Sequence, residues 1–292
     1  DDHKYFHSFQ PPHLSTTPFT WCTIAPPLLY PTGKIHVHNL FSVADKIALV
    51  TGGSRGIGLM IARAYVEGGA TVYISSRKAD VCDAVAADLS KYGTCYSLPA
   101  DISTMEGVEY LAAEVAKRED KLDILVNNAG VAWGAPVDDF PEQGWDKVMD
   151  LNVKSLFFLT QKLLPLLRAA ASAEDPARII NIGSVDGLSN TLMETWSYPA
   201  SKAAVHHLTR AMAHRFAQDN INANAIAPGP FVSQMTEVML EQHGDKMAET
   251  IPCGRIGSPD DMAGTAIYLA SKASAYVTGH VIPLDGGLVN AT

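Results

Sequence analysis

From Val43 to the end of the chain, short runs of apolar residues alternate with segments in which apolar residues recur every three or four positions. Continuous apolar runs are typical of strands buried on both faces, and the longer spacing is typical of amphipathic helices. The alternation predicts a parallel sheet with crossover helices on both faces. Seven strands are expected, over residues 46–51, 70–76, 94–99, 122–127, 178–182, 221–226 and 277–283.

The connections between these strands carry the helical pattern. Helices are expected from a Gly-rich turn to about residue 68, over 79–91, around 108–115, over 145–171 and 197–217, and after residue 258. The last of them starts with Ser258, Pro259 and Asp261, the arrangement of a capping box with proline in the first turn. The pattern therefore predicts a single α/β domain over residues 43–292, a Rossmann-type doubly wound, seven-stranded parallel sheet.

Residues 1–42 lack this pattern. They hold six of the 17 prolines and five of the ten histidines, but no arginine and no acid after Asp2. A segment rich in Pro, Ser and Thr cannot bury a regular face without a period, so we expect an irregular, non-catalytic extension. The scarcity of acids also fits a remnant of an organelle-targeting peptide, although the lack of arginine argues against that alternative.

Composition narrows the class of protein. Lys and Arg number 22 against 31 Asp and Glu, a net charge of −9 without a basic cluster, which argues against a nucleic-acid partner. No apolar run approaches the roughly 20 residues that a membrane-spanning helix needs, so no membrane partner is expected. The cysteines, Cys22, Cys82, Cys95 and Cys253, have no metal-ligand spacing. We therefore expect free thiols, no metal, and an intracellular, cytoplasmic protein.

The turn after the first expected strand is rich in glycine. It reads Thr51-Gly-Gly-Ser-Arg-Gly-Ile-Gly58 and leads directly into a helix. Glycines let a ligand approach the backbone, and free N–H groups at a helix start attract a pyrophosphate. Tight turns without a ligand use the same residues, but the position after the first strand favours dinucleotide binding. The contacts expected from this turn are Gly52, Ser54, Arg55, Gly56, Ile57 and Gly58.

The end of the second expected strand indicates which nicotinamide cofactor fits. An acid there would bind the ribose 2′-hydroxyl of NAD, but this chain has Ser76, Arg77 and Lys78. The positive charges of Arg55, Arg77 and Lys78 favour binding of the 2′-phosphate of NADP(H). The alternative is that Arg77 and Lys78 are only the solvated start of a helix.

Hydride transfer from a nicotinamide cofactor to a ketone leaves an alkoxide, so an enzyme with this chemistry also needs a proton donor. Tyrosine can serve if a cation nearby makes it more acidic, and a lysine four residues later on a helix can supply that charge. The spacing Tyr-x-x-x-Lys occurs three times. The pair at Tyr30 lies in the irregular extension. Tyr268 and Lys272 close a late helix and are expected to be a packed tyrosine and a solvated lysine.

The third pair is favoured by its context. Tyr198 and Lys202 open a helix that follows Ser184 at a strand end, where open α/β sheets bind ligands. Here the chain resembles the short-chain dehydrogenase/reductases, from Val43 to the C-terminus. The motifs that carry the resemblance are the Gly-rich turn, Asp101, Asn127-Asn-Ala-Gly130, Asn152, Ser184, Tyr198-Pro-Ala-Ser-Lys202 and Pro228-Gly229.

The resemblance implies a role for each matching residue. Tyr198 would be the proton donor, and Lys202 would bind the nicotinamide ribose and promote Tyr198 ionisation. Ser184 would hold the substrate carbonyl oxygen, and Asn152 would support a water-linked proton relay. From the residues alone, Asn152 could instead bridge backbone groups and Ser184 could be a turn residue. The further cofactor contacts implied are Asp101, Ile102, Asn128, Ala129, Gly130, Pro228, Gly229, Phe231 and Val232.

The stretches 181–187 and 201–210 look most like the β-ketoacyl reductase branch, which includes rhamnolipid-associated reductases. We expect an NADPH-dependent reductase of a ketone, 3-oxoacyl or polyketide-like, with a Met-rich substrate lid at about 231–252. The alternatives are an NAD-dependent alcohol dehydrogenase and a non-catalytic dinucleotide-sensing or scaffold protein. Family members commonly form tetramers, so a homotetramer or homodimer is expected through the helices at 145–171 and 197–217.

One departure from the family pattern is visible. Ser184 and Tyr198 are separated by 13 residues, one more than the common family spacing, so we expect the intervening loop to bulge. The apolar residues of this loop would face substrate or simply pack; they are Leu188, Leu192, Met193 and Trp196.

Overall fold

The computed structural model describes residues 37–190, 193–232 and 248–289, and within these ranges seven parallel strands form one sheet. The strands are β1 (Ile47–Thr51), β2 (Thr71–Ser75), β3 (Thr94–Ser97), β4 (Ile124–Asn127), β5 (Ala177–Ile182), β6 (Ile221–Pro228) and β7 (Val281–Leu284). Their order is β3-β2-β1-β4-β5-β6-β7. The order reverses between β1 and β4, and doubly wound sheets bind ligands outside the carboxyl ends of such strands.

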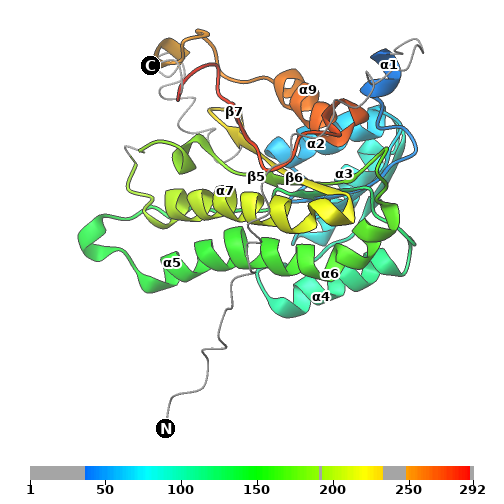
Figure 1. Ribbon diagram of the computed structural model, residues 1–292. Helices are drawn as coiled ribbons and strands as arrows, with labels where there is room; N and C mark the ends of the chain where they lie inside the picture. The colour runs from blue at the N-terminus through cyan, green and yellow to red at the C-terminus, as the bar shows by residue number, and fades with distance from the viewer. Residues whose placement is uncertain (1–36, 191–192, 233–247, 290–292) are drawn as a thin grey trace, which may run out of the picture. The chain divides into compact units, whose positions relative to one another are not determined.

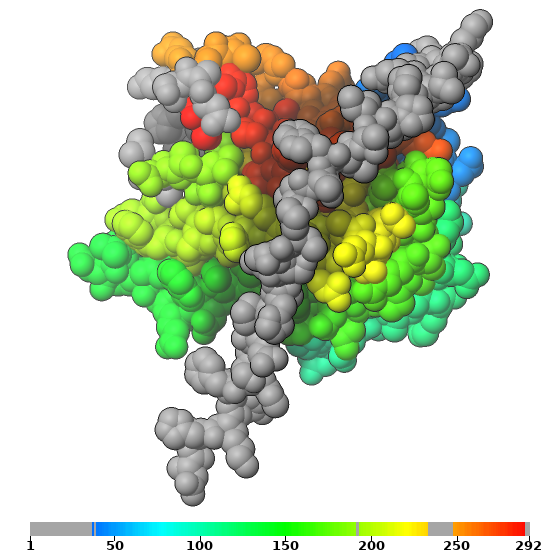
Figure 2. All heavy atoms as spheres, in the orientation of Figure 1, coloured from blue at the N-terminus to red at the C-terminus, as the bar shows by residue number. Residues whose placement is uncertain are grey.

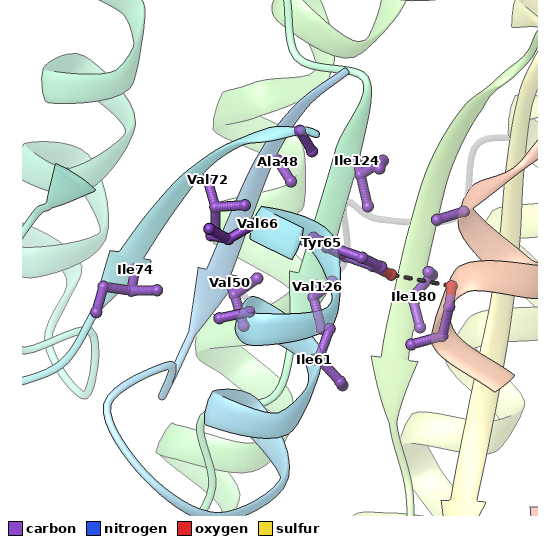
Figure 3. Packing of buried hydrophobic residues seen from close by; sticks show 14 of the residues in the cluster. Ala48, Val50, Ile61, Tyr65, Val66, Val72, Ile74, Ile124, Val126 and Ile180 are labelled. Carbon is purple, nitrogen blue, oxygen red and sulfur yellow. Dashed lines mark hydrogen bonds between the residues drawn. The ribbon is translucent and has the colours of Figure 1, made fainter. Parts of the chain in front are cut away.

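Helices cover both faces of the sheet (Figure 1). The helices that share one core are α2 (Gly56–Glu67), α3 (Ala79–Leu89) and α9 (Pro259–Ala270). Those that share the other are α4 (Met105–Ala116), α6 (Ser155–Ala170) and α7 (Ser197–Phe216). Figure 3 shows Tyr65 of α2 in the first core, where its hydroxyl donates to the backbone oxygen of Ala266 at 3.1 Å. This bond joins α2 to α9 above the strands.

The segment predicted as one helix over 145–171 is helical from Glu142 to Ala170, but it contains a π-helical turn that was not predicted. Helix α5 (Glu142–Met149) passes through a π-helical turn, η2 (Asp150–Lys154), before α6 begins. A π turn inserts an extra residue without changing the direction of the chain, and the apolar spacing of the sequence did not reveal it. The turn directs Asn152 to the backbone of Val131, which it bonds twice.

The other predicted strands and helices are present, with ends shifted by a few residues. The predicted capping box is confirmed, because the Ser258 hydroxyl accepts from the Asp261 N–H and the Asp261 carboxylate accepts from the Ser258 N–H. A short helix, α1 (Val37–Leu40), lies before the predicted domain boundary at residue 43. Residues 1–36 of the predicted irregular extension lie outside the described residues, as do Leu192 and residues 233–247 of the predicted lid.

In the described ranges, no helix combines the length and the apolar character needed to cross a membrane. The same part of the chain contains no cluster of three or more His, Cys, Asp or Glu side chains that could hold a metal ion.

Candidate active site

The Gly-rich turn lies at the carboxyl end of β1 and leads into α2, as predicted. Gly52 (φ +64) and Gly56 (φ +53) adopt left-handed backbone angles that favour glycine. Gly58 has no room for a side chain, because a Cβ there would lie 2.3 Å from the Gly52 carbonyl oxygen. The turn thus has the tight backbone geometry of a phosphate-binding loop. Its other predicted contacts are Ser54, which is buried, Ile57, which is half-buried, and Arg55, which is exposed.

Thr51 and Asn128 join the carboxyl ends of β1 and β4, where the strand order reverses. The Thr51 hydroxyl accepts from the backbone N–H groups of Asn128 and Ala129, at 3.0 and 3.1 Å. The Asn128 side-chain amide donates to the carbonyl oxygens of Thr51 and Gly52, at 2.9 and 3.2 Å. Sequence reasoning gave Thr51 no role of its own. The side chain of Asn128, predicted to line the cofactor cleft, holds the Gly-rich turn in place.

The predicted basic residues lie on two segments that are bonded to each other. The Gly53 N–H donates to the Ser75 carbonyl oxygen at 3.3 Å, which holds the Gly-rich turn against the end of β2. Arg55, Arg77 and Lys78 are all exposed. Lys78 is also the N-cap residue of α3, so the alternative of a solvated helix start stays open for it.

Ser76, Asp101 and Ile102 lie close to one another at the ends of neighbouring strands. The Ala100 N–H donates to the Ser76 carbonyl oxygen at 3.0 Å. Asp101 is exposed, and its Oδ1 accepts from the backbone and hydroxyl of Ser103 at 3.1 and 2.7 Å. The Ile102 side chain is buried in the second core, so only its backbone can reach a ligand.

Tyr198, Lys202 and Ser184 come together where β5 ends and α7 begins. Lys202 is buried, and its Nζ lies 5.5 Å from the centroid of the Tyr198 ring. The same Nζ donates to the carbonyl oxygen of Ile182 at 2.8 Å. Ser184 Oγ accepts from the Asp186 N–H at 3.2 Å, so the serine caps a short 3₁₀ helix, η3 (Val185–Gly187). The serine is therefore a turn residue and a neighbour of Tyr198 at the same time.

Asn152 lies beside Lys202 at the edge of the crevice. A Cβ at Gly130 would lie 3.2 Å from Asn152 Oδ1 and 3.6 Å from Lys202 Nζ. The amide of Asn152 also donates to Ser201 Oγ at 2.9 Å, and Ser201 donates to the Tyr198 carbonyl oxygen at 2.7 Å. Asn152 therefore bridges backbone groups, as one alternative held, and it also adjoins the lysine. Ser201 was not singled out from the sequence.

Burial dominates the electrostatics of these groups. Burial raises the pKa of Tyr198 to about 12, while a hydrogen bond with Ser184 lowers it and the Asp186 charge raises it further. Burial lowers the pKa of Lys202 to about 8, which the Asp186 charge opposes. The Tyr198 pKa is therefore raised, whereas a neighbouring cation was predicted to lower it, and Lys202 is not among the causes of the shift. Asp186 raises the pKa of both groups, and sequence reasoning missed it.

The segment after β6 places the side chain of one predicted cofactor contact in the interior. Pro228 ends β6, and the Gly229 N–H donates to the Leu284 carbonyl oxygen at 3.0 Å. The ring of Phe231 is buried against Gly257, where a Cβ would lie 2.4 Å from it. A ring packed in this way cannot reach a cofactor, so only the backbone of Phe231 is available. Val232 is exposed.

The competing tyrosine in the described residues is packed as expected. Tyr268 packs against the first core and lies 6.5 Å from the Phe41 ring, measured between centroids. Helix α9 ends before Lys272, which is exposed. In the loop before Tyr198, the described apolar side chains are exposed rather than packed: Leu188, Met193 and Trp196. Trp196 also lines a hollow of about 530 Å³ together with Val137, Phe140, Pro141, Glu142 and Trp145.

Comparison with known proteins agrees with this geometry. A family model described as enoyl-(acyl carrier protein) reductase matches residues 52–289. The rhamnolipids biosynthesis 3-oxoacyl-[acyl-carrier-protein] reductase of Pseudomonas aeruginosa is 51% identical over 253 residues, which cover 86% of this chain and 99% of the relative. The short-chain dehydrogenase/reductase PhomF of Diaporthe leptostromiformis is 33% identical and covers 89% of this chain and 97% of its own. The chain belongs to the short-chain dehydrogenase/reductase family.

A solved structure of a family member has the same fold. The Pseudomonas aeruginosa RhlG/NADP active-site complex matches with a TM-score of 0.84 at 51% identity and covers 86% of this chain and 99% of its own. The predicted fold class and the predicted family are thereby confirmed. As a short-chain dehydrogenase/reductase, the chain is an oxidoreductase, and the predicted non-catalytic alternative loses its support.

Proposed function

We propose that this short-chain dehydrogenase/reductase reduces a ketone with NADPH and that Tyr198 is the proton donor. The observation that carries the proposal is the convergence of Ser184, Tyr198 and Lys202 at the end of β5, on the same sheet edge as the Gly-rich turn. NADPH, when bound, supplies the hydride to the carbonyl carbon. The residues of the chain orient the carbonyl group and supply the proton.

Ser184 and Tyr198 act on the carbonyl oxygen. The Ser184 oxygen already accepts from the Asp186 N–H, and the Ser184 proton, which bonds to Tyr198 when no substrate is present, would turn to the substrate oxygen. A donor placed there stabilises the negative charge that develops on this oxygen during hydride transfer. The phenolic O–H bond of Tyr198 then breaks as the proton passes to the alkoxide oxygen, which leaves a tyrosinate.

Lys202 and Asn152 restore the proton. A Lys202 pKa of about 8 leaves the ammonium form in excess near neutral pH, where its charge stabilises the tyrosinate. Lys202 Nζ and Asn152 Oδ1 both lie close to the point that a Cβ of Gly130 would occupy, which supports the proposed relay from the lysine through water. The bonds from Asn152 to Val131 and Ser201 hold the amide in position for this role.

The residues at the other end of the crevice fit NADP(H). The Gly-rich turn and the start of α2 would hold the pyrophosphate, and Asp101 would contact the adenine. No acid follows β2 to repel a 2′-phosphate, and Arg55, Arg77 and Lys78 are exposed where that phosphate would lie. The NADP complex of a relative that is 51% identical supports the same cofactor.

For the substrate we propose a 3-oxoacyl or polyketide-like ketone. The activity in the name of the Pseudomonas aeruginosa relative supports the first class. An acyl chain also needs an apolar surface near the reacting carbonyl. Trp196, two residues before Tyr198, contributes to the hollow of about 530 Å³ that could supply it.

The proposal is tested with Tyr198→Phe. We expect kcat to fall at least about 100-fold, because general acid catalysis is lost, while the Kd for NADPH is unchanged. NADPH oxidation is followed by absorbance across a panel of ketones that includes 3-oxoacyl thioesters. Tyr268→Phe is the matched control, since it removes the hydroxyl of a packed tyrosine with the same lysine spacing. Wild-type turnover in Tyr198→Phe would contradict the proposal.

Cofactor choice separates this function from an NAD-dependent alcohol dehydrogenase. We expect Arg77→Asp to weaken NADPH binding about 10- to 100-fold, as loss of a charged hydrogen bond does, and to leave NADH binding unharmed. Lys272→Asp, at another exposed site, controls for the change in net charge. Equal effects of Arg77→Asp on both cofactors would favour the NAD-dependent alternative.

We also propose that α6 and α7 form the contact of a homodimer or homotetramer. Figure 2 shows the outer surfaces of these helices on one face, in green to yellow-green. Leu163 and Leu167 are buried in the core, but Phe157 is 40% exposed beside a hollow between the helices. We expect Phe157→Glu to convert the wild-type oligomer to a monomer in light scattering. A monomeric wild type would refute this contact.

A cytoplasmic location completes the proposal. Cys82 and Cys95 are both free thiols in the first core, and burial raises the pKa of Cys95 to about 12. Free buried thiols suit a reducing compartment. Fractionation of the cells that produce the protein tests this location, and recovery of the protein with an organelle would contradict it.

A further inference from the structure

A buried histidine lies behind the candidate active site. His206 follows Lys202 by four residues in α7 and is only 2% exposed. A Cβ at Gly183 would lie 2.1 Å from Nε2 of His206, and a Cβ at Gly187 would lie 2.8 Å from Cε1. Gly183 immediately precedes Ser184, and Gly187 ends the short helix that Ser184 caps. The ring therefore contacts the serine turn on both sides of the serine.

The same turn rests on the backbone of α7. Besides the His206 ring, a Cβ at Gly187 would meet the carbonyl carbon of Lys202 at 2.7 Å and the nitrogen of Ala203 at 2.8 Å. At Gly183, by contrast, the three nearest atoms all belong to the His206 ring. Gly183 thus faces α7 through the His206 ring, while its N–H donates to the Ile226 carbonyl oxygen at 2.7 Å and Lys202 Nζ holds the neighbouring Ile182 carbonyl oxygen at 2.8 Å.

The polar atoms of the ring do not explain its presence. Within the described part of the chain, neither ring nitrogen makes a well-formed hydrogen bond, although the Gly187 backbone approaches the ring. Burial lowers the pKa of His206 to about 4, the Gly187 backbone opposes this, and the charges of Lys202 and Arg210 lower it further. The ring is therefore neutral near physiological pH. Buried polar atoms without partners destabilise a fold, which argues for a role beyond stability.

We propose that His206 is a positioning residue that holds the Ser184 turn at a fixed distance from Tyr198 and Lys202. The inference rests on the proposed role of Ser184 toward the carbonyl oxygen. Without the ring, the space that it fills beside Gly183 is empty, and the turn can move toward the helix. A displacement of about 1 Å in an active site can lower the rate about 100-fold.

The first test compares His206→Ala with a variant of equal destabilisation. We expect kcat of His206→Ala to fall roughly 10-fold or more, with the Kd for NADPH unchanged, because the cofactor end of the crevice is untouched. Val115→Ala, in the second core on α4, serves as the control and should lower Tm but keep the wild-type kcat. Wild-type kcat in folded His206→Ala, or an equal loss of kcat in Val115→Ala, overturns the proposal. If His206→Ala does not fold, His206→Asn takes its place, with the same expected fall in kcat and the same unchanged Kd for NADPH.

The second test exploits the close approach of the ring to Gly183. Gly183→Ala is expected to lower kcat more than His206→Ala does, because the new methyl group collides with the ring. In the His206→Ala background the same substitution should be tolerated and should restore part of kcat, since the methyl group occupies space left by the ring. Equal costs of Gly183→Ala in both backgrounds would show that the ring does not set the turn.

Ser184→Ala separates this inference from the proposed function. If Ser184→Ala keeps wild-type kcat, the proposed role of the serine fails. If Ser184→Ala lowers kcat but folded His206→Ala does not, only the inference about His206 fails. If the role of Ser184 and the inference about His206 are both correct, Ser184→Ala lowers kcat by a smaller factor in the His206→Ala background than in the wild type. The reason is that both residues act through the Ser184 hydroxyl.

Discussion

Gly58→Ala is the sharpest perturbation of the predicted cofactor end. A Cβ at residue 58 would lie 2.3 Å from the Gly52 oxygen and 2.4 Å from Asn128 Nδ2, so the Gly-rich turn must move away from α2. Overpacking of this kind costs about 1–3 kcal/mol. Loss of the two hydrogen bonds from Asn128 adds about 1 kcal/mol each, offset by about 1 kcal/mol from the helix preference for alanine.

We therefore expect the free energy of unfolding to fall by about 2–4 kcal/mol, which lowers Tm by roughly 4–16 °C in a domain of this size. The measurements are thermal unfolding with and without NADPH and a fluorescence titration of NADPH. Gly264→Ala in α9 is the control, because a Cβ there meets nothing within 4 Å and the alanine should raise Tm slightly. If Gly58→Ala matches the wild type in both Tm and NADPH affinity, the close packing of the turn is refuted.

Three further outcomes are expected. Thr51→Val removes the acceptor of two backbone N–H groups and should lower the free energy of unfolding by about 2–4 kcal/mol in urea titrations, with Thr51→Ser largely restoring it. Asp186→Asn removes a charge that raises the pKa values of Lys202 and Tyr198, so both values fall and the pH profile of kcat/KM shifts to lower pH; an unshifted profile counts against this electrostatic coupling. Asp261→Ala should lower the free energy of unfolding by about 1 kcal/mol. Because its bonds to Arg255 and Ser258 lower the folded-state pKa of Asp261, this stabilisation exists above the unfolded pKa of about 4 and shrinks as the pH falls below it, which Tm measured against pH can check.

The fold was predictable because its signals are local and repeated. Each buried strand is a short apolar run, and each crossover helix shows its own apolar stripe, so the alternation alone indicated a parallel sheet. The choice of Tyr198 over Tyr268 was predictable for a related reason. A strand-end serine precedes only the first of them, and the structure packs Tyr268 into the first core.

The features that could not be predicted depend on contacts between residues distant in sequence. Thr51 meets Asn128 across the crevice, and the π turn at Asp150–Lys154 directs Asn152 to a neighbouring loop. No local period marks either feature. Phe231 is a predicted cofactor contact, and no local pattern indicated that Gly257 accommodates its ring in the interior. Burial likewise decides the Tyr198 pKa, and burial is a property of the whole fold.

The glycines of the site show how closely its parts approach one another. Gly130, Gly183 and Gly187 do not have left-handed backbone angles. Each nevertheless lies so close to Asn152, Lys202 or His206 that a Cβ would have little or no room. Their lack of a side chain is what brings Asn152, Lys202 and the Ser184 turn within reach of a common ligand. A substitution at any of the three should therefore act first on the geometry of catalysis and only second on stability. Gly264 faces open space, so a substitution there should leave the geometry of catalysis unchanged.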